Sequence, residues 1–512
     1  MRPTNLSTKR LSLGGLIALA ATLAFATLLS PSAALAEAPR DRFNAGGYFR
    51  IMTRPDFQGG DGKLGYWNLY GRLLNEGPWG TLALKLDLVQ NAVRSDPYAT
   101  VVAQIEGGSF QNTDVNMGSL GVFALTRLYI EAGNIFTQNL VFQIGTLEKR
   151  FGDLGMYDMW PAEIFADTVG LSVRYDTKHY EVLLGVGDAG FATRKGDYST
   201  IFSMGGTLKL KLGGHLEIGV GGQFRFEPEV QGNKNAPYAT PGVSYEDYLR
   251  HEVVSKWFDA HPGLDFIQDN LPQSTSSNSY KLIGYVGFGN IGPLKWNNFF
   301  VNYLKSHPQN FYTESYGGND YTVYVKELTD ERHQVNLGNE MQLAIVPGWL
   351  DATWSLLFGY HFDSDNELAP NDFNRTYMST VLRLQAYVTP VVHILAETSL
   401  AREKSHNGNL YRQHFDSVFA NTNGLSDTRG FEMGDSDTRD TWQMKAGIVL
   451  NPNGRGIFNR PSLRLLYGLQ YSTQNRAWGN ASFSDSLDQY NIFSGTESHW
   501  HSVIAIEAEA WF

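Results

Sequence analysis

The chain has 512 residues, a net charge of −11, no cysteine and 13% aromatic residues. With no basic surplus, binding of nucleic acid as the main task is excluded. The lack of cysteine excludes disulfides, thiolate metal sites and cysteine nucleophiles. Many aromatic side chains in a chain with a mean hydropathy of −0.28 indicate strands with one apolar face and one wet face.

The amino terminus has the pattern of a cleaved secretory signal, which we place at residues 1–36. A basic start precedes an apolar run at residues 11–29, and the Ala-Leu-Ala at residues 34–36 fits a cleavage site. The apolar run is long enough to span a membrane, so an uncleaved anchor is the alternative reading. We predict that residues 37–512 form the exported, mature domain.

The rest of the chain alternates between apolar and polar residues with a period of two. Residues 81–88 read T-L-A-L-K-L-D-L, which places leucines on one face and Lys85 and Asp87 on the other. No later apolar run reaches the roughly 18 residues that a spanning helix needs. Charges on one face and large apolar groups on the other suit a strand between lipid and water. A β-sandwich is the soluble alternative, but it would not need strands this long and regular.

Eighteen such segments can be counted along the chain. They begin near Phe43, Leu64, Thr81, Val122, Leu140, Thr168, His179, Phe202, His215, Ser279, Trp296, His333, Asp351, Thr376, Val391, Thr441, Pro461 and Trp500. Short and long connections alternate, and the long ones include Asn91–Leu120, Phe151–Asp167 and His307–Arg332. This asymmetry and the even strand number predict an all-β, 18-stranded, transmembrane antiparallel β-barrel in the bacterial outer membrane. A barrel of this size has room for an aqueous channel.

Several short stretches, in the right order along the chain, resemble the maltoporin family of sugar-specific porins. They are Gly47-Tyr48-Phe49-Arg50, Lys149-Arg150-Phe151 with residues 153–160, Leu294–Phe300, Thr389-Pro390, Ile457–Pro461 and Trp511. The resemblance implies a homotrimer of 18-stranded barrels, in which the third loop folds inward and narrows each channel. It also implies an aromatic slide that conducts oligosaccharides of the maltodextrin kind. Flat rings bury the C–H face of a sugar, while charged groups bind its hydroxyls.

The resemblance implies two sets of site residues. The slide aromatics would be Tyr48, Tyr70, Trp160, Trp296, Phe458 and Trp511. The polar constriction would hold Arg50, Arg72, Arg127, Arg150, Asp153 and Asp158, although Arg72 stands where a carboxylate is expected. For Trp296, Phe458 and Trp511 an interfacial girdle is the alternative, because barrels carry aromatic girdles at both interfaces.

The sequence therefore favours a sugar-selective channel that is not an enzyme. A general diffusion porin and an outer-membrane barrel enzyme are the alternatives; the enzyme needs Ser, His and Asp to converge, and no serine can be argued for His333 or His393. The partners implied are oligosaccharides and outer-membrane lipid, with a periplasmic sugar-binding protein as a further candidate. No cofactor is expected. The acidic stretches at residues 363–367 and 435–437 have ligands that suit Ca²⁺, but solvated loop is the simpler reading.

Overall fold

The structure is a computed structural model, and it describes part of the chain. The described residues are 42–58, 62–65, 68–91, 93, 95–108, 123–189, 201–227, 277–306, 311–316, 319–324, 332–363, 375–405, 438–473 and 498–512. The chain divides into two units, Met1–Arg42 and Phe43–Phe512, and the second holds every described element. The predicted signal lies outside the described residues, as do the acidic side chains of both candidate Ca²⁺ loops.

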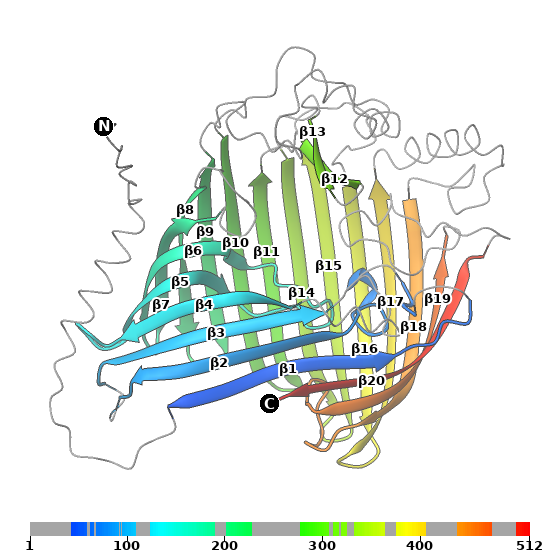
Figure 1. Cartoon of the computed structure of the whole chain (residues 1–512). Helices are drawn as coiled ribbons and strands as arrows, with labels where there is room; N and C mark the ends of the chain where they lie inside the picture. The colour runs from blue at the N-terminus through cyan, green and yellow to red at the C-terminus, as the bar shows by residue number, and fades with distance from the viewer. Residues whose placement is uncertain are drawn as a thin grey trace, which may run out of the picture. The chain divides into compact units, whose positions relative to one another are not determined.

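Eighteen strands pair in one antiparallel sheet that closes on itself, because each strand pairs with its neighbours along the chain and β20 pairs with β1 (Figure 1). The strands are β1 (Phe43–Thr53), β2 (Trp79–Val89), β3 (Tyr98–Gly108), β4 (Phe123–Gly133), β5 (Leu140–Arg150), β6 (Glu163–Asp176), β7 (Tyr180–Asp188), β8 (Phe202–Leu212), β9 (Leu216–Glu227), β10 (Ser277–Ile291), β11 (Leu294–Ser306), β14 (Arg332–Val346), β15 (Leu350–Asp363), β16 (Arg375–Tyr387), β17 (Val392–Ser405), β18 (Thr438–Leu450), β19 (Ser462–Ser472) and β20 (Trp500–Trp511). The predicted 18-stranded β-barrel is confirmed.

Three described elements lie outside the barrel sheet. The hairpin of β12 (Phe311–Tyr316) and β13 (Asn319–Tyr324) occupies the predicted connection between β11 and β14. A 3-10 turn, η1 (Asn68–Tyr70), lies between β1 and β2. Among the described residues, no helix is long and apolar enough to cross a membrane.

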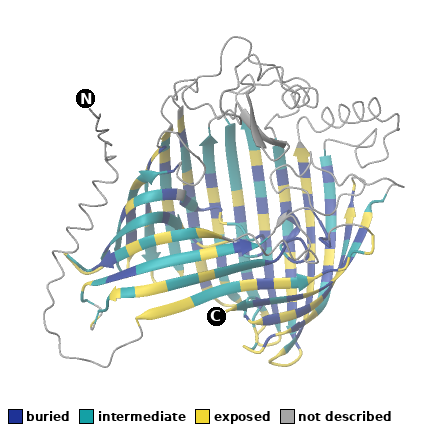
Figure 2. Ribbon diagram, in the orientation of Figure 1, coloured by how far each residue is buried: buried dark blue, intermediate teal, exposed yellow. Residues whose placement is uncertain are grey.

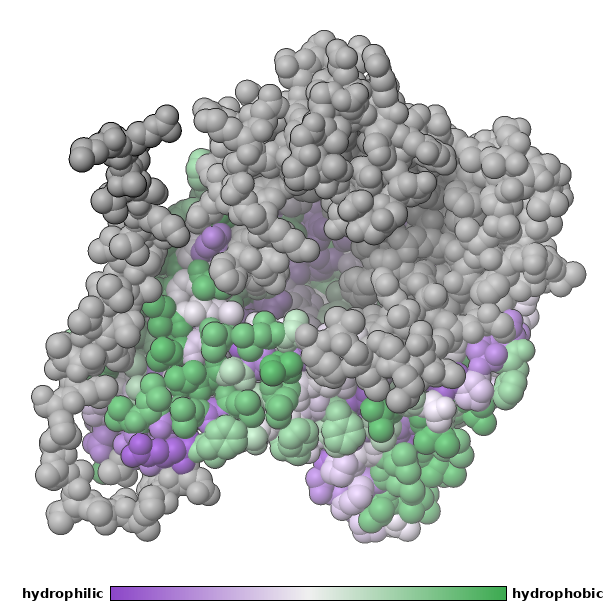
Figure 3. Space-filling model, viewed as in Figure 1, coloured by the Kyte–Doolittle hydropathy of each residue, from purple (hydrophilic) through white to green (hydrophobic). Residues whose placement is uncertain are grey.

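The predicted alternation separates an apolar outer face from a polar inner face. On β19, Leu463, Leu465 and Tyr467 are 44–52% exposed, whereas Arg464 between them is 4% exposed. The same alternation appears as bands of buried and exposed residues along β14 to β19 (Figure 2). Hydrophobic side chains gather on the outer face of the strands (Figure 3). Lipid can cover this outer face, while the charged row points into the barrel.

Two errors in the predicted strands cancel in the count. Leu64 was expected to begin a strand, but its segment leaves the sheet and is buried inside the barrel. Conversely, β3 lies within the stretch expected to be the long loop Asn91–Leu120. The outer row of β3 contains Val101, Ala103 and Ile105, opposite the outward leucines of β2. Its inner row includes the apolar Val102 next to Val101, so the alternation is interrupted in the middle of the strand.

The barrel closes at the last residue of the chain. Gly47 and Phe512 exchange two backbone hydrogen bonds, of 2.9 and 3.1 Å. A Cβ atom at Gly47 would lie 2.5 Å from the ring of Phe512, so a glycine is required for this close approach.

The sheet is incomplete between β4 and β5. Their pairing runs only from Gly133 with Val141 to Tyr129 with Gly145. Beyond it, the Thr146 hydroxyl accepts a hydrogen bond from the Leu128 N–H (3.0 Å) and donates one to the Leu128 carbonyl (3.3 Å). Gly145 has a φ of 124°, and a Cβ there would lie 2.3 Å from the Leu128 carbonyl oxygen. Gly145 thus allows β5 to leave β4, and the side chain of Thr146 replaces part of the missing ladder.

The two faces should respond differently to substitution on one strand. Leu84, on the outer face at the middle of β2, should destabilise the barrel by about 2–4 kcal/mol when changed to Arg, since charge is costly near the bilayer midplane. Urea unfolding in lipid vesicles measures this. Lys85→Gln, on the lumenal face of the same strand, is the control and should leave the midpoint nearly unchanged. Equal losses in both variants would contradict the assignment of faces.

The departure of β5 from β4 should depend on glycine. Gly145→Ala places a Cβ against the Leu128 carbonyl at a backbone conformation that costs about 1–3 kcal/mol for other residues. The unfolding midpoint in urea should fall accordingly. Gly214→Ala, in a turn where a Cβ meets no atom within 4 Å, serves as the control. A midpoint for Gly145→Ala as high as that of the control would show that the strain is absent.

Candidate functional site

Between β1 and β2, residues 62–65 and 69–76 lie inside the barrel, where all but Arg72 are buried, and they are called the first loop below. Ser379 donates a hydrogen bond to the Leu69 carbonyl, and the Lys445 ammonium donates to the carbonyls of Tyr70 (2.9 Å) and Gly71 (3.3 Å). The Leu74 N–H donates to Glu507 at 3.3 Å. The polar inner face of β16 to β20 therefore holds the backbone of this loop.

A cluster of buried apolar side chains also holds the first loop against the barrel wall. Its leucines pack against apolar side chains on the inner face of β17 to β20. The members of this cluster are Leu64, Leu73, Leu74, Leu395, Val449, Leu466, Val503 and Ala505. Burial of leucines in the barrel interior explains why the alternation around Leu64 does not mark a strand facing lipid.

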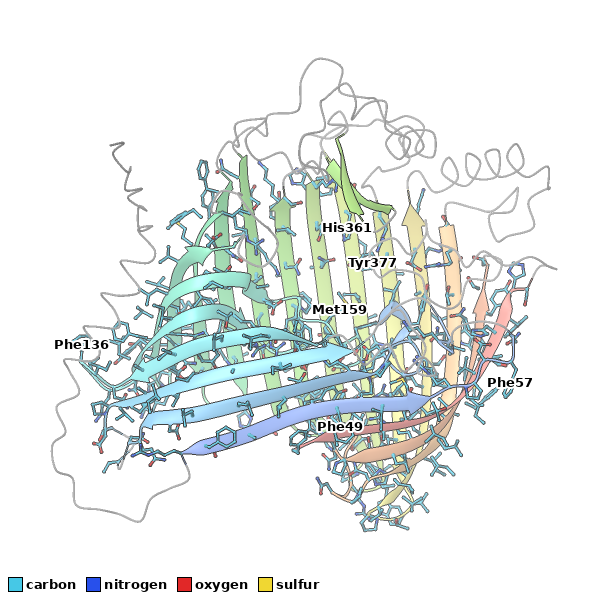
Figure 4. All side chains as sticks on the ribbon, in the orientation of Figure 1. Phe49, Phe57, Phe136, Met159, His361 and Tyr377 are labelled. Carbon is cyan, nitrogen blue, oxygen red and sulfur yellow. The ribbon has the colours of Figure 1, made fainter. Side chains whose placement is uncertain are left out.

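The third loop, residues 151–162 between β5 and β6, crosses to the same inner wall. The N–H groups of Gly155 and Met156 donate to Glu340 on β14, at 3.0 and 2.9 Å. The Tyr157 hydroxyl donates to Ser379 on β16 at 3.2 Å. Met159 of this loop lies amid the barrel, whereas Phe49 and Phe136 lie at its periphery (Figure 4). The third loop thus contacts side chains of β14 and β16.

The two loops meet and form an apolar core inside the barrel. The Arg72 N–H donates to the Met156 carbonyl at 2.9 Å. The core includes Leu69, Tyr70, Phe151, Leu154, Met156, Tyr157, Phe300 and Leu357, and Met159 and Phe458 pack against it. The same core includes Leu147 on β5, Ile164 on β6, Leu183 on β7 and Tyr285 on β10, so it also reaches the opposite wall of the barrel.

A network of ion pairs lies where the first loop meets β1 and β20. Arg50 pairs with Glu76, and Arg72 pairs with both Glu76 (3.3 Å) and Glu509 (3.2 Å). Arg460 and Arg464 also bind Glu509, at 2.6 and 2.5 Å. Removal of one partner from such a buried network leaves an uncompensated charge, which is strongly destabilising.

The electrostatics of the network are set by burial and by its own charges. Burial raises the pKa of Glu76 to about 7, against the opposing effect of Arg50. Burial alone would lower the pKa of Arg72, but Glu509 and Glu76 outweigh it and hold that pKa well above its usual value. Burial and the neighbouring Arg464 lower the pKa of Arg460 to about 9.

Aromatic pairs flank this network. The rings of Tyr48 and Trp511 lie 4.8 Å apart, and the Tyr48 hydroxyl donates to Glu509 at 2.8 Å. The rings of Trp296 and Phe458 lie 6.0 Å apart. Four of the six predicted slide aromatics thus form two pairs, each joining strands or turns distant in the sequence.

Trp160 forms a separate part of the site. Its ring is 39% exposed, and the guanidinium of Arg150 lies 4.6 Å from its centroid. Arg150 and Arg127 both pair with Glu148, Arg150 at 3.6 Å. Asp153 interacts electrostatically with Arg150, and also with Arg72 of the ion-pair network.

Two of the predicted site residues are placed differently from the expectation. Tyr70 is 1% exposed, and its hydroxyl donates to Glu403 at 2.5 Å, so neither face of its ring is open to a ligand. The prediction that Tyr70 belongs to the slide is wrong for this structure. Arg50 is 4% exposed and binds Glu76 and the Gly77 carbonyl, so it positions the first loop.

The remaining predicted polar residues fall into two groups. Asp158 interacts electrostatically with Arg50 and Arg72, while Arg127 and Arg150 lie together near Trp160. Sequence reasoning missed the carboxylates that organise the loops, Glu76 and Glu340. Glu340 offered a signal, since it is a charge on the inner row of a long strand, but its partners are backbone groups that no pattern shows.

The chain matches no protein-family model and no curated protein. Among solved structures it is similar to OccAB1 of Acinetobacter baumannii, with 10% identity over 92% of this chain and 97% of that chain and a TM-score of 0.42. It is similar to the outer membrane channel DcaP of the same species, with 10% identity over 93% and 100% and a TM-score of 0.39. Wzi of Escherichia coli, a carbohydrate-binding β-barrel, has 11% identity over 98% and 89% and a TM-score of 0.36. At this level of similarity, none of these structures supports a role for any residue of the site.

The class of protein follows from the chain's own geometry. A closed antiparallel sheet, apolar outward rows and charged inward rows are the features of a barrel that spans the outer membrane. The chain is an 18-stranded β-barrel protein that resides in the bacterial outer membrane.

The pair of Arg50 and Glu76 should hold the first loop in place. Arg50→Met leaves Glu76 buried without its main partner and should destabilise the protein by about 3–5 kcal/mol. The double variant Arg50→Met/Glu76→Gln should recover much of this loss, because no uncompensated charge remains. Urea unfolding gives the energies, and trypsin cleavage after Arg72 reports release of the loop. Additive losses in the double variant would show that the two side chains act independently.

Proposed function

We propose that the protein is a saccharide-selective channel of the outer membrane, as its resemblance to the maltoporin family implies. The observation that carries the proposal is Trp160, an exposed ring in the barrel interior with Arg150 stacked on it and Asp153 nearby. A sugar presents an apolar C–H face to such a ring and a rim of hydroxyls to the charged groups. Weak contacts of this kind allow both entry and exit.

The paired aromatics support a path that continues beyond Trp160. The Trp296 N–H donates at 2.9 Å to Gln342, a buried side chain on the inner face of β14. Phe458 packs against the apolar core that the loops form inside the barrel. Both contacts are lumenal and favour a slide over a lipid-facing girdle for these two residues. Trp511 contacts Tyr48, whose hydroxyl binds the lumenal Glu509.

The filled interior favours selective passage over general diffusion. Two loops occupy the side of the lumen lined by β14 to β20, and the inward charges there, such as Glu397 and Lys445, are at most 2% exposed. In this proposal, solutes pass Trp160, whose ring stays exposed beside the loops. A general diffusion porin would need a wider water-filled path.

The enzyme alternative has less support. His393 uses both ring nitrogens, towards Gln385 and the Pro390 carbonyl, and His333 stacks between Tyr303 and Phe362. Neither histidine is placed as a general base by these contacts. Among the described side chains, no group of three His, Asp or Glu residues is arranged to hold a metal ion. The absence of a cofactor, the homotrimer and the periplasmic sugar-binding protein stay predictions.

Removal of the exposed ring should weaken sugar binding. Trp160→Ala loses the stacking surface, and we expect oligosaccharide binding to weaken by about 1–3 kcal/mol. Ion conductance should stay equal or rise. The measurement is sugar-dependent block of single-channel current in a planar bilayer, with a maltodextrin series as the probe.

Trp500→Ala is the matched control, because Trp500 is 50% exposed on the outer face of β20. It should leave the block unchanged. If the Trp160 variant retains the block of the original protein, the ring is not part of a sugar path, and the proposal loses its main support.

A further inference from the structure

Glu148 lies where the pairing of β5 with both of its neighbours is interrupted. The ladder between β4 and β5 ends at the pair of Tyr129 and Gly145. The ladder between β5 and β6 passes from Leu147 directly to Lys149, so it omits Glu148. Such irregularities change the direction in which a side chain points, and they are common beside functional sites. The direction of the Glu148 side chain is therefore not set by the regular alternation of a strand.

The carboxylate of Glu148 joins arginines from two strands. It pairs with Arg127 on β4 and with Arg150 on β5, where Glu148 Oε1 lies 3.6 Å from Arg150 Nε. The two pairs use different carboxylate oxygens, so both form at once. The side chains of Arg127, Glu148 and Arg150 are 31%, 23% and 37% exposed, so all three are partly open to solvent. This sets them apart from the ion-pair network around Glu509, which is buried.

Arg150 connects Glu148 to the third loop. Its guanidinium carbon lies 4.6 Å from the centroid of the Trp160 ring, so it covers part of that ring. Trp160 is nevertheless 39% exposed, which leaves part of the ring open to a ligand. The electron-rich face of an indole attracts a guanidinium, but at an exposed site this attraction is weak. The ion pair with Glu148 adds a second contact that holds the guanidinium on the ring.

We propose that Glu148 is a positioning residue for sugar binding: its carboxylate holds the Arg150 guanidinium on Trp160, and this fixes the ring in the orientation that a sugar meets. The inference rests on the proposed function and adds a residue to its site. A ring that is already ordered in the empty channel loses less conformational entropy when a sugar stacks on its open part. Residues that lock the side chains of a binding site in this way contribute to affinity without touching the ligand.

The test is block of single-channel current by maltotriose in the variant Glu148→Gln. Loss of the carboxylate charge releases Arg150, and we expect the sugar to bind about two- to fivefold more weakly, the range for one partly exposed ion pair. The dissociation rate of the sugar should rise while its association rate stays nearly unchanged, because the ring is loosened but not removed. Glu148→Asp, which keeps a carboxylate, should restore part of the affinity. Unchanged block in Glu148→Gln would overturn the inference.

Glu131→Gln is the matched control, because Glu131 on β4 also pairs with an arginine, Arg174 at 3.3 Å, and its side chain is 21% exposed. This variant should keep the block of the original protein. An equal loss in Glu131→Gln and Glu148→Gln would assign the effect to the lost charge alone, and would overturn the role of Glu148.

A double variant separates positioning from a purely structural role. Glu148→Gln should weaken the block no further when Arg150 is already changed to Met, because the guanidinium that it positions is gone. Additive losses would show that Glu148 acts through the stability of the barrel, and would overturn the inference.

The outcome for Trp160→Ala distinguishes this inference from the proposed function. Block that is weakened in Trp160→Ala but unchanged in Glu148→Gln would overturn only the role of Glu148 and leave the saccharide channel standing. No block of the original protein by any maltodextrin would overturn the proposed function, and this inference with it.

Discussion

The carboxylate of Glu509 joins the parts on which this barrel depends. It accepts hydrogen bonds from Tyr48 on β1 at 2.8 Å, Arg72 of the first loop at 3.2 Å and Arg464 on β19 at 2.5 Å, and it pairs with Arg460 at 2.6 Å. One buried group therefore connects the closing strands, the first loop and the turn between β18 and β19. Such a charge is tolerated only with partners of this quality, because its desolvation is costly.

Two loops fill part of the lumen because the inner wall of the barrel binds them. The first loop is held by polar groups of β16 to β20, and the third loop by Glu340 on β14 and by the first loop itself. The barrel is wide enough for water, but its inner wall on this side serves as the binding surface for its own loops. The exposed ring of Trp160 lies with the partly exposed guanidiniums of Arg150 on β5 and of Arg127 on β4, which share Glu148.

The sequence predicted the barrel because one face of each strand meets lipid and the other meets water, and that contrast repeats every second residue. The prediction missed β3, where the apolar Val102 interrupts the alternation. It also placed a strand at Leu64, where apolar residues instead pack inside the barrel. The resemblance named Trp296 and Phe458 for the slide, and their rings lie 6.0 Å apart in the structure. The burial of Tyr70 could not be predicted, because it depends on contact with Glu403, 333 residues away. Loop docking of this kind leaves no periodic signal in a single chain.

The long reach of the first loop has a consequence for assembly. This loop emerges early in the chain, yet its contacts lie 310 residues away at Ser379 and 433 residues away at Glu507. Contacts of such high sequence separation form late, because the intervening chain must first be ordered. The loop therefore has no seat until the last strands are in place, and its leucines stay exposed to solvent until then. The apolar cluster of the first loop is therefore completed only when β17 to β20 have joined the barrel.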